Sequence, residues 1–595
     1  MMAARADGPV VVGISAHFHD SAVAVLVGGE LVNAAHEERY TRVKQDPGLP
    51  HRALRHCLDE AGLTLADVDC VAYYEDPVKK LDRQLWMGLP KVPDTRPDAL
   101  FRLDADRPRR DVREVLGFDG RLEIVEHHLS HAASAYYYSG FPDAAVLTVD
   151  AVGEWATTTW GRGDGDRLDL VDEVRFPHSL GLLYSTITGH LGFEVNEGEY
   201  KVMGLAPYGE PRFADRVRQL ITITDEGTFT LDLSYFDFRD PDGMGTERLT
   251  ELLRVPPREP ESEIGQIHCD LARSLQLVTE ETLLALAARA RRLVPSDRLC
   301  MAGGVALNVV ATRRVVEEGP FKEVFVQPAA GDAGGSLGAA AVAHQRITGS
   351  RIAPARMRSA LLGPPVPAAE VARTVEAAGP RGFLDFRGRE PELLDAVAGR
   401  LAEGKVVGWY HGRMEFGPRA LGGRSILADP RGADMRDRIN ASVKMREAFR
   451  PFAPAVLAEK AAEHFRLDHP SPFMLETCEV ISPLDLPAIT HVDRSARVQT
   501  VTAADNGRFY RLIKAFEART DCPIVLNTSF NLRGEPIVCT PQDALLCFLR
   551  SAIDCLVLED FVIDRDNLPA AWRTWFEGTR PPRASVVSDS VYTLL

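Results

Sequence analysis

The sequence lacks three features that each define a class of protein. No run of about 18 apolar residues occurs among its 595 residues, so we expect no membrane-spanning helix. No Cys-x-x-Cys pair occurs among the nine cysteines, which disfavours zinc fingers and fits reduced thiols. Basic residues are outnumbered, 69 Lys and Arg against 85 Asp and Glu, and the net charge of −16 disfavours binding to nucleic acid or an anionic membrane. The N-terminal stretch also has no apolar signal-peptide core, and we expect a cytoplasmic protein.

The pattern along the chain predicts α/β architecture with an internal duplication. Apolar, β-rich runs at 10–16 and 22–27 flank a polar turn, and residues 144–161 repeat this plan. Later segments such as 298–308 and 323–345 read as a strand, a glycine turn and a helix. Sheet edges of this kind are where α/β proteins bind ligands.

The length predicts two domains, because 595 residues exceed what one hydrophobic core usually holds. Apolar periodicity fades in a proline-rich stretch, which we interpret as a linker over 351–374. We therefore predict one domain at 1–350 and a second at 375–595, the latter ending in an irregular tail.

A histidine cluster, VEHHLSHAASAYYY, suggests a metal site. On a helix, positions i and i+4 face the same side, so His127 and His131 can bind one ion while His128 diverges. Asp150 and Asp332 each follow an apolar strand beside glycine and could complete the shell. Such a set admits iron(II), manganese or zinc. Surface or capping histidines and turn-forming aspartates are the alternatives.

Turn residues elsewhere in the first domain are candidates for catalysis and nucleotide binding. His19 and Asp20 lie together in the first polar turn, where an imidazole could act as a general base. Glycine turns let a backbone approach a nucleotide closely, although packing explains such glycines equally well. The nucleotide-binding candidates are Gly303, Gly304, Asn308, Gly334, Gly335 and Lys201, the last of which could instead form a surface ion pair.

A basic segment predicts an anion site in the second domain. Residues 413–450 contain nine Lys and Arg against five Asp and Glu, in a chain that is acidic overall. Arg419 lies among turn formers and apolar residues, where a guanidinium suits phosphate or carbamate recognition. The later stretch LNTSFNLRGEP, 526–536, reads as a strand ending in hydroxyl and amide groups, which turn chemistry alone would also explain.

Several long motifs carry a resemblance to a known family. GISAHFHDSAVAVLVGGELVNAAHEERYTR, HHLSHAASA, EYKVMGLAPYG, AGGVALN and GDAGGSLGAA, followed by GRMEFGPRALGGRSILADPR, FRPFAP, HVDRSARVQTV and LNTSFNLRGEPIV, resemble the O-carbamoyltransferases of antibiotic and nodulation-factor biosynthesis. The resemblance covers nearly the whole chain. It implies a duplicated actin-like ATPase (ribonuclease H-like) domain, followed by a smaller α/β domain similar to threonylcarbamoyl-adenylate synthase.

The same resemblance implies roles for individual residues. It places catalysis on His19 and Asp20 and an iron ion on His127, His131, Asp150 and Asp332. It places ATP and carbamoyl phosphate in the second domain, on Arg419, Lys444, Arg446, Arg450, Arg497, Asn527, Ser529 and Asn531.

The implied reaction has two stages. Carbamoyl phosphate and Mg²⁺-ATP would give carbamoyl-adenylate in the second domain, and a hydroxyl of a small-molecule natural product would receive the carbamoyl group in the first. The alternatives are a sugar kinase or other actin-like ATPase, a tRNA threonylcarbamoyl-type transferase, a hydrogenase-maturation carbamoyltransferase and a nucleotide sensor. The acidic charge disfavours the tRNA enzyme, and the missing paired cysteines disfavour the maturation enzyme. The motifs select neither the acceptor nor the oligomeric state.

Overall fold

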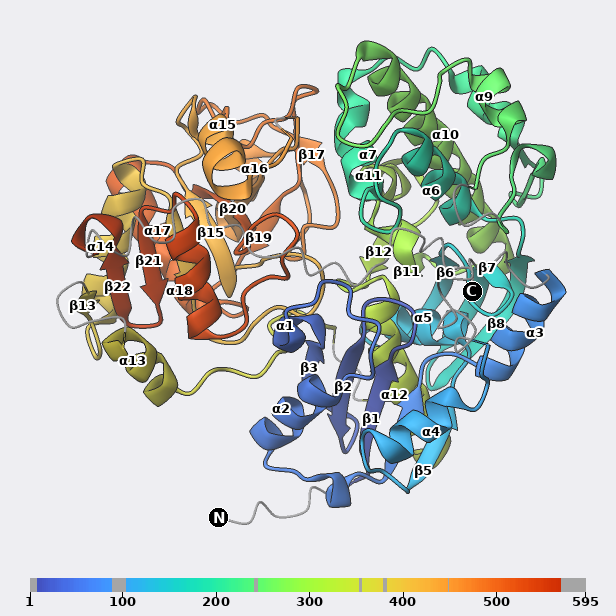
Figure 1. Cartoon of the computed structure of the whole chain (residues 1–595), viewed down its shortest axis with the longest axis horizontal. Coiled ribbons are helices and arrows are strands. Elements are labelled where there is room, and N and C mark those ends of the chain that lie inside the picture. Colours follow the sequence, from blue (N-terminus) through green and yellow to red (C-terminus); the bar gives the residue numbers. More distant parts are fainter. Residues whose placement is uncertain are drawn as a thin grey trace. The chain divides into compact units, whose positions relative to one another are not determined.

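The computed structural model describes residues 8–87, 103–239, 244–352, 356–377, 383–447 and 449–568. The chain forms two compact units, each described here by itself (Figure 1). The first unit contains the described residues up to Glu37 and Gln45–Met357, and the second contains Glu38–Lys44 and the described residues from Arg358 onward.

Two five-stranded sheets in the first unit share one topology. Their orders are β3-β2-β1-β4-β5 and β8-β7-β6-β11-β12. In each, three antiparallel strands are followed by two strands parallel to the first strand of the repeat. This repeat confirms the predicted duplication and the actin-like, ribonuclease H-like fold. The strands are β1 (Val10–Ser15), β2 (Ala22–Val27), β3 (Glu30–His36), β4 (Cys70–Tyr73), β5 (Arg121–Ile124), β6 (Asp143–Val149), β7 (Ala156–Asp164), β8 (Arg167–Arg175), β11 (Arg298–Ala302) and β12 (Glu323–Val326).

The last helix of each repeat packs against the other. Helix α5 (His127–Tyr136) follows β5, and α12 (Asp332–Thr348) follows β12. Their backbones approach so closely that a Cβ at Gly338 would lie 1.7 Å from the carbonyl oxygen of Ser130. Because α12 also lies on β1 and α5 on β6 and β11, the two helices join the repeats. This contact fixes the positions of the N-terminal turns of α5 and α12, which carry histidine and aspartate side chains.

The first unit contains further helices and a small β-ribbon. The helices are α2 (His51–Ala61), α3 (Pro77–Met87), α4 (Arg107–Glu114), α6 (Leu180–His190), α7 (Glu199–Leu205), α8 (Ala214–Val217), α9 (Glu247–Leu253), α10 (Gln266–Leu293) and α11 (Val309–Glu318). The ribbon pairs β9 (Ile221–Ile223) with β10 (Phe229–Leu231). No helix within the described ranges is both long and apolar enough to cross a membrane.

The second unit is built on an eight-stranded mixed sheet. Its order is β13-β22-β21-β14-β15-β20-β16-β19. The strands are β13 (Phe383–Asp385), β14 (Val407–Tyr410), β15 (Arg424–Ala428), β16 (Ala453–Leu457), β19 (Gln499–Val501), β20 (Ile524–Ser529), β21 (Cys555–Leu558) and β22 (Phe561–Asp564), and β17 (Cys478–Glu479) pairs separately with β18 (Ser495–Ala496). The helices are α13 (Ala368–Ala377), α14 (Glu390–Ala402), α15 (Met435–Ile439), α16 (Ala461–His464), α17 (Gly507–Thr520) and α18 (Pro541–Arg550).

The predicted linker was wrong in its second half. Val371 and Val375 of α13 are fully buried in the core of the second unit, so this helix belongs to the folded unit. Prolines flanking the helix concealed its short apolar pattern. The predicted irregular tail from 569 onward lies outside the described residues.

A short segment after β3 belongs to the second unit. It contains helix α1 (Glu38–Thr41) and ends at Lys44. Arg39 Nη2 donates to the carbonyl of Gly417 at 3.0 Å, and Arg42 donates to the carbonyls of Pro536 and Ile537 at 2.9 and 2.7 Å. The chain therefore enters and leaves the second unit once before it completes the first.

Candidate functional site

The four predicted metal ligands come from three separate elements of the first unit. His127 and His131 lie on consecutive turns of α5, Asp150 directly follows β6, and Asp332 is the first residue of α12. One carboxylate or imidazole atom from each lies within 4.8 Å of all the others. The duplicated fold thus gathers residues that are as much as two hundred positions apart.

Imidazole nitrogens and carboxylate oxygens face one another at this cluster. Nε2 of His131 lies 3.0 Å from Nε2 of His127 and 2.9 Å from Oδ2 of Asp150. Oδ1 of Asp332 lies 3.7 Å from Nε2 of His127 and 3.6 Å from Nε2 of His131. Two imidazole nitrogens at 3.0 Å are compatible only if they share a proton or both direct lone pairs at a cation.

Neighbouring groups hold the carboxylates in place. Oδ1 of Asp150 accepts hydrogen bonds from the backbone N–H of Ala151 at 2.8 Å and Gly304 at 3.1 Å, which leaves Oδ2 for the histidines. The Tyr74 hydroxyl donates to Oδ2 of Asp332 at 3.4 Å. His128 diverges from the cluster, as its position predicts, and contacts the Thr148 hydroxyl at 2.6 Å.

Electrostatic interactions within the cluster favour the ionised form of both the carboxylates and the imidazoles. Burial alone would raise the pKa of Asp150, but hydrogen bonds to His127 and His131 hold it well below its ordinary value. Burial would likewise lower the pKa of His131, and the carboxylates of Asp150 and Asp332 raise it to about 9 instead. Two buried carboxylates thus favour a positive charge beside them. Protonated imidazole supplies that charge here, and a bound divalent ion would supply it as well.

The donor set fits a divalent transition metal. Two imidazole nitrogens and two carboxylate oxygens, with no thiolate, form a borderline-to-hard shell that suits iron(II), manganese or zinc. Their convergence on one point is the arrangement that such an ion requires. The identity of the metal stays a prediction.

The predicted catalytic pair lies at the tip of the β1–β2 hairpin. Nδ1 of His19 lies 3.2 Å from Oδ2 of Asp20, and Asp20 has a left-handed backbone, φ 54°. Burial would lower the pKa of His19, but the charges of Asp332, Asp20 and Asp150 raise it to about 9. These shifts place His19 within electrostatic reach of the four-ligand cluster.

The predicted nucleotide-binding residues mainly have structural partners. Gly303 has φ 92°, and a Cβ there would lie 2.2 Å from the carbonyl oxygen of Val149. Gly304 supports Asp150 as described, and the Asn308 side chain caps α11 and pairs with Gln276.

The second group of these candidates lies on α12 and α7. A Cβ at Gly334 would meet the carbonyl of Ala329 at 2.1 Å, and one at Gly335 would meet the Tyr74 ring at 2.7 Å. Close packing therefore accounts for both glycines. Lys201 lies on α7 with its ammonium 5.7 Å from the centre of the Phe193 ring. Nucleotide binding by these residues stays a prediction.

In the second unit, Lys444 is buried among oxygen acceptors. Its Nζ donates to the carbonyl and hydroxyl of Ser529 and to the carbonyl and side-chain oxygens of Asn531, the last at 2.8 Å. Burial lowers the pKa of Lys444 well below its ordinary value, and the charges of Arg446 and Arg450 lower it further. Lys444 and the strand end predicted from LNTSFN thus form one polar cluster.

Four arginines gather in the same unit. Burial lowers the pKa of Arg497 well below its ordinary value, and the neighbouring charges of Arg419, Arg446 and Arg450 act in the same direction. Nε of Arg497 is buried without a hydrogen-bond partner among the described residues. Buried like charges are costly, and an anionic ligand offsets that cost.

Asn527 occupies a supporting position in this unit. Its side-chain amide donates to the carbonyl of Ala420 at 3.2 Å and to Gln499 at 2.9 Å, and its Oδ1 is buried without a partner among the described residues. It ties β20 to the loop that carries Arg419. The predicted anion-binding residues therefore come from one region of the second unit.

Sequence reasoning missed several buried polar groups near the four predicted metal ligands. Oε1 of Glu154 accepts from the backbone N–H of His127 at 2.9 Å and so fixes the start of α5. Tyr74 and Thr148, which contact Asp332 and His128, were also missed. Glu154 lies in the acidic, glycine-bearing turn after β6, which was the available signal for it.

Family models match both parts of the chain. The model for the carbamoyltransferase N-terminus matches residues 10–93 and 112–341, and the model for the carbamoyltransferase C-terminus matches residues 398–565. The chain belongs to the carbamoyltransferase family. The resemblance predicted from the motifs is thereby confirmed, and this carbamoyltransferase is a transferase enzyme.

Three relatives are similar to this chain over 60–97% of its length. An uncharacterized protein of Synechocystis is 44% identical, covering 95% of this chain and 99% of its own length. Nodulation protein NolNO of Sinorhizobium fredii is 37% identical over 97% of this chain and 83% of its own length. The 3'-hydroxymethylcephem-O-carbamoyltransferase of Amycolatopsis lactamdurans is 34% identical over 60% of this chain and 63% of its own.

Proposed function

We propose that this carbamoyltransferase is an ATP-dependent O-carbamoyltransferase that works in two stages, through carbamoyl-adenylate. The observation that carries the proposal is the presence of two separate polar sites. One is the cluster of His127, His131, Asp150 and Asp332 near His19, and the other is the Lys444 site beside the four arginines. Neither site alone accounts for both making and transferring an activated carbamoyl group.

The second unit is suited to the adenylating stage. Water hydrolyses carbamoyl phosphate to carbamate and inorganic phosphate, and an oxygen of the carbamate then attacks the α-phosphorus of ATP, so that pyrophosphate leaves. The reactants bring several negative charges together, and guanidinium groups such as Arg419 and Arg497 offset them. Mg²⁺ bound to ATP would share that task. Burial and neighbouring arginines lower the pKa of Lys444, and an anion bound beside its side chain would raise that pKa.

The first unit is suited to the transfer stage. An acceptor hydroxyl attacks the carbamoyl carbon, its proton goes to a base, and the bond to the adenylate oxygen breaks to release AMP. His19 is the proposed base, held by Asp20 at the hairpin tip. His127, His131, Asp150 and Asp332 would hold the metal, which when bound supplies Lewis-acid polarisation of an oxygen.

His19 must be unprotonated to act as a base. The carboxylates that raise its pKa to about 9 include Asp332 and Asp150, both members of the four-ligand cluster. A positive charge held by the cluster offsets these two carboxylates and lowers the pKa of His19 toward neutrality. The proposed base and the proposed metal ligands are therefore electrostatically linked.

Pyrophosphate release tests the proposal without knowledge of the acceptor. The purified enzyme is incubated with ATP and Mg²⁺, with and without carbamoyl phosphate. We expect release that depends on carbamoyl phosphate. Release that is independent of it, or no release from enzyme whose metal content is verified, would contradict the adenylating stage and favour a kinase-like activity of the first unit.

A further inference from the structure

The turn that carries the proposed base has an uncommon backbone conformation. This turn, residues 16–21, joins β1 to β2, and both His17 and Asp20 have left-handed backbones, φ 72° and 54°. Residues with a Cβ rarely adopt that region, and they stay in it only where surrounding contacts hold them. The contacts around the turn therefore decide where it places His19.

The contact to Asp20 alone does not orient the imidazole of His19. Nδ1 of His19 lies 3.2 Å from Oδ2 of Asp20, but this Nδ1 has no hydrogen-bond partner of good geometry among the described residues. The Phe18 ring lies beside the imidazole, with the ring centres 4.3 Å apart. The direction of the imidazole consequently depends on the backbone of the turn.

His17 connects this turn to two other elements of the first unit. Its Nδ1 lies 3.0 Å from the hydroxyl of Tyr73 at the end of β4, and its Nε2 lies 3.0 Å from Oδ2 of Asp111 on α4. The Tyr73 hydroxyl donates to the carbonyl of Ala16 at 2.9 Å. The backbone N–H of His17 donates to the carbonyl of Pro47 at 2.8 Å. The first half of the turn is thus held mainly through His17.

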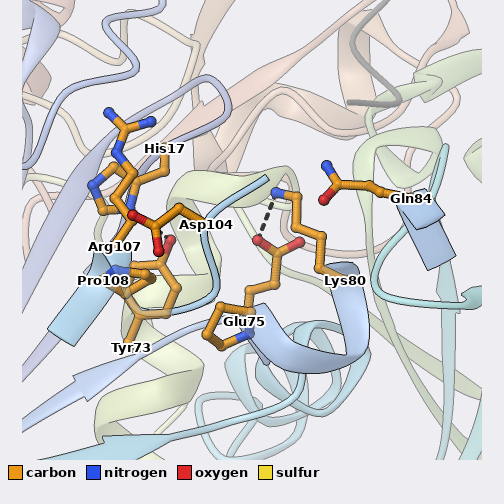
Figure 2. Close-up of a pocket in the computed structure, with 9 residues that line it drawn as sticks. His17, Tyr73, Glu75, Lys80, Gln84, Asp104, Arg107 and Pro108 are labelled. Carbon is orange, nitrogen blue, oxygen red and sulfur yellow. Dashed lines mark hydrogen bonds and ion pairs between the residues drawn. The ribbon is translucent and has the colours of Figure 1, made fainter. Parts of the chain in front are cut away.

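Asp111 is the charged end of this connection. The hydrogen bond from His17 holds the pKa of Asp111 below its ordinary value, against the opposing effect of burial. The carboxylate therefore accepts, and Nε2 of His17 donates. Arg107 and Arg110 also lie 3.3 and 3.7 Å from this carboxylate. Figure 2 shows His17 with Tyr73 and Arg107 at one side of a small pocket.

The residue that holds His17 lies outside the family match. The N-terminal family model covers His17 and Tyr73 within residues 10–93 and resumes at 112, one position after Asp111. The turn is thus part of the family pattern, whereas the carboxylate that binds its first histidine belongs to a segment that the family model leaves unmatched. The family resemblance therefore does not supply this connection.

We propose that His17 is a positioning residue for the transfer stage, and that its bond to Asp111 keeps the His19 turn beside the four-ligand cluster. The inference rests on the proposed function, because His19 is the proposed base of that stage. A base displaced by about 1 Å loses much of its effect on rate, since proton transfer requires hydrogen-bond reach. In this scheme Asp111 acts only through His17.

Hydrogen exchange measures the turn without any substrate. Peptides that span residues 16–21 are followed by mass spectrometry in wild type, Asp111→Ala, Asp111→Asn and Glu114→Ala. Asp111→Ala removes the acceptor for Nε2–H of His17, and we expect exchange to become about tenfold faster or more. The amide in Asp111→Asn keeps an acceptor, so this variant should stay near wild type, as should Glu114→Ala at an exposed position on α4. Unchanged exchange in Asp111→Ala would overturn the proposal.

Transfer kinetics show whether the position of the turn matters to the chemistry. The probe is chemically supplied carbamoyl-adenylate with water as the hydroxyl acceptor, and AMP release is measured above the spontaneous rate. We expect Asp111→Ala to lower kcat about tenfold, with KM for carbamoyl-adenylate and metal content close to wild type, because the base is displaced and binding is not. Asp111→Asn should keep most of the wild-type kcat. Equal losses in both variants would assign the effect to the ion pairs with Arg107 and Arg110 and overturn the role of His17.

A double substitution separates a direct link from general destabilisation. His17→Ala and Asp111→Ala remove the same hydrogen bond, so the double variant should be no slower than the slower single variant. Additive losses would overturn the direct link. If wild-type enzyme releases no AMP above the spontaneous rate, the proposed transfer stage is contradicted, while hydrogen exchange still decides whether Asp111 holds the turn.

Discussion

At the scale of single residues, the main feature of the first unit is a buried group of two imidazoles and two carboxylates, whose negative charge favours a bound cation. Two imidazoles lie with Nε2 atoms 3.0 Å apart, and two carboxylates beside them are held ionised. Each ligand atom therefore depends on the other three. Removing one should affect metal binding and transfer together while leaving the second unit intact.

We expect His131→Ala to lower carbamoyl transfer by about 100-fold or more and to reduce bound metal, because it deletes one of four ligands. Pyrophosphate release without acceptor should stay near the wild-type rate. Elemental analysis and the two half-reaction assays measure this. His128→Ala is the matched control, since His128 is equally buried but faces Thr148. Equal loss of both half-reactions would refute this division between the units.

In the second unit, Lys444 is the residue whose substitution tests the adenylating stage. We expect Lys444→Met to lower pyrophosphate release by about 100-fold or more, because it removes the hydrogen-bond donor that Ser529 and Asn531 share in the predicted anion site. Chemically supplied carbamoyl-adenylate should restore product formation. Lys460→Met, at a half-exposed lysine paired with Glu463, is the control. Failure of the rescue would show that Lys444 serves folding or transfer.

At the scale of elements, the geometry of the four predicted metal ligands depends on how closely α5 and α12 approach. Each helix supplies ligands at its first turns, and glycine at 338 lets the two backbones touch. A substitution far from the ligands can therefore displace them. A substitution at the contact between the two helices therefore tests the geometry of the pair without changing any predicted ligand.

We expect Gly338→Ala to destabilise the protein by about 1–3 kcal/mol or more and to weaken metal binding, because its Cβ would lie 1.7 Å from the carbonyl oxygen of Ser130. Urea unfolding and metal content measure the two effects. Gly399→Ala on α14 is the control, because its nearest neighbour would be 3.8 Å away, and it should be neutral or slightly stabilising. Full metal binding by a destabilised Gly338→Ala would contradict this dependence.

At the scale of the whole molecule, one short segment from the first part of the chain, residues 38–44, belongs to the second unit. Backbone N–H groups of His17 and Ser21 donate to the carbonyls of Pro47 and Asp46, and the N–H of Glu37 donates to Ser21, all within the first unit. The residues between, 38–44, belong to the second unit and contact its loops at Gly417 and Pro536. The predicted catalytic turn therefore bonds to residues on both sides of segment 38–44, and that segment itself bonds within the second unit.

We expect Arg42→Ala to lower overall carbamoylation more than pyrophosphate release, by about fivefold or more, because it removes the two hydrogen bonds that hold segment 38–44 in the second unit and removes no predicted site residue. Overall carbamoylation is measured with ATP, carbamoyl phosphate and an accepted hydroxyl compound. Arg55→Ala, at an exposed arginine on α2, should change neither rate. A parallel decrease in both activities would indicate a local effect on the second unit alone.

Local pattern in the sequence determined the family, the duplicated α/β fold and the spacing of His127 and His131, because strand alternation, helical spacing and long motifs are properties of neighbouring residues. Strand ends suggested the two aspartates and the family resemblance grouped them with the histidines, but only the packing of α5 against α12 shows how residues two hundred positions apart come together.

Only the tertiary structure decided the remaining features. It placed α13 in a core, residues 38–44 in the second unit, and the Gln84 amide of α3 in a buried position without a hydrogen-bond partner among the described residues. A glutamine on an amphipathic helix or a short polar segment after a strand looks the same in sequence whether it faces water or protein. Its role is set by which distant side chains surround it, and those contacts exist only in the folded chain.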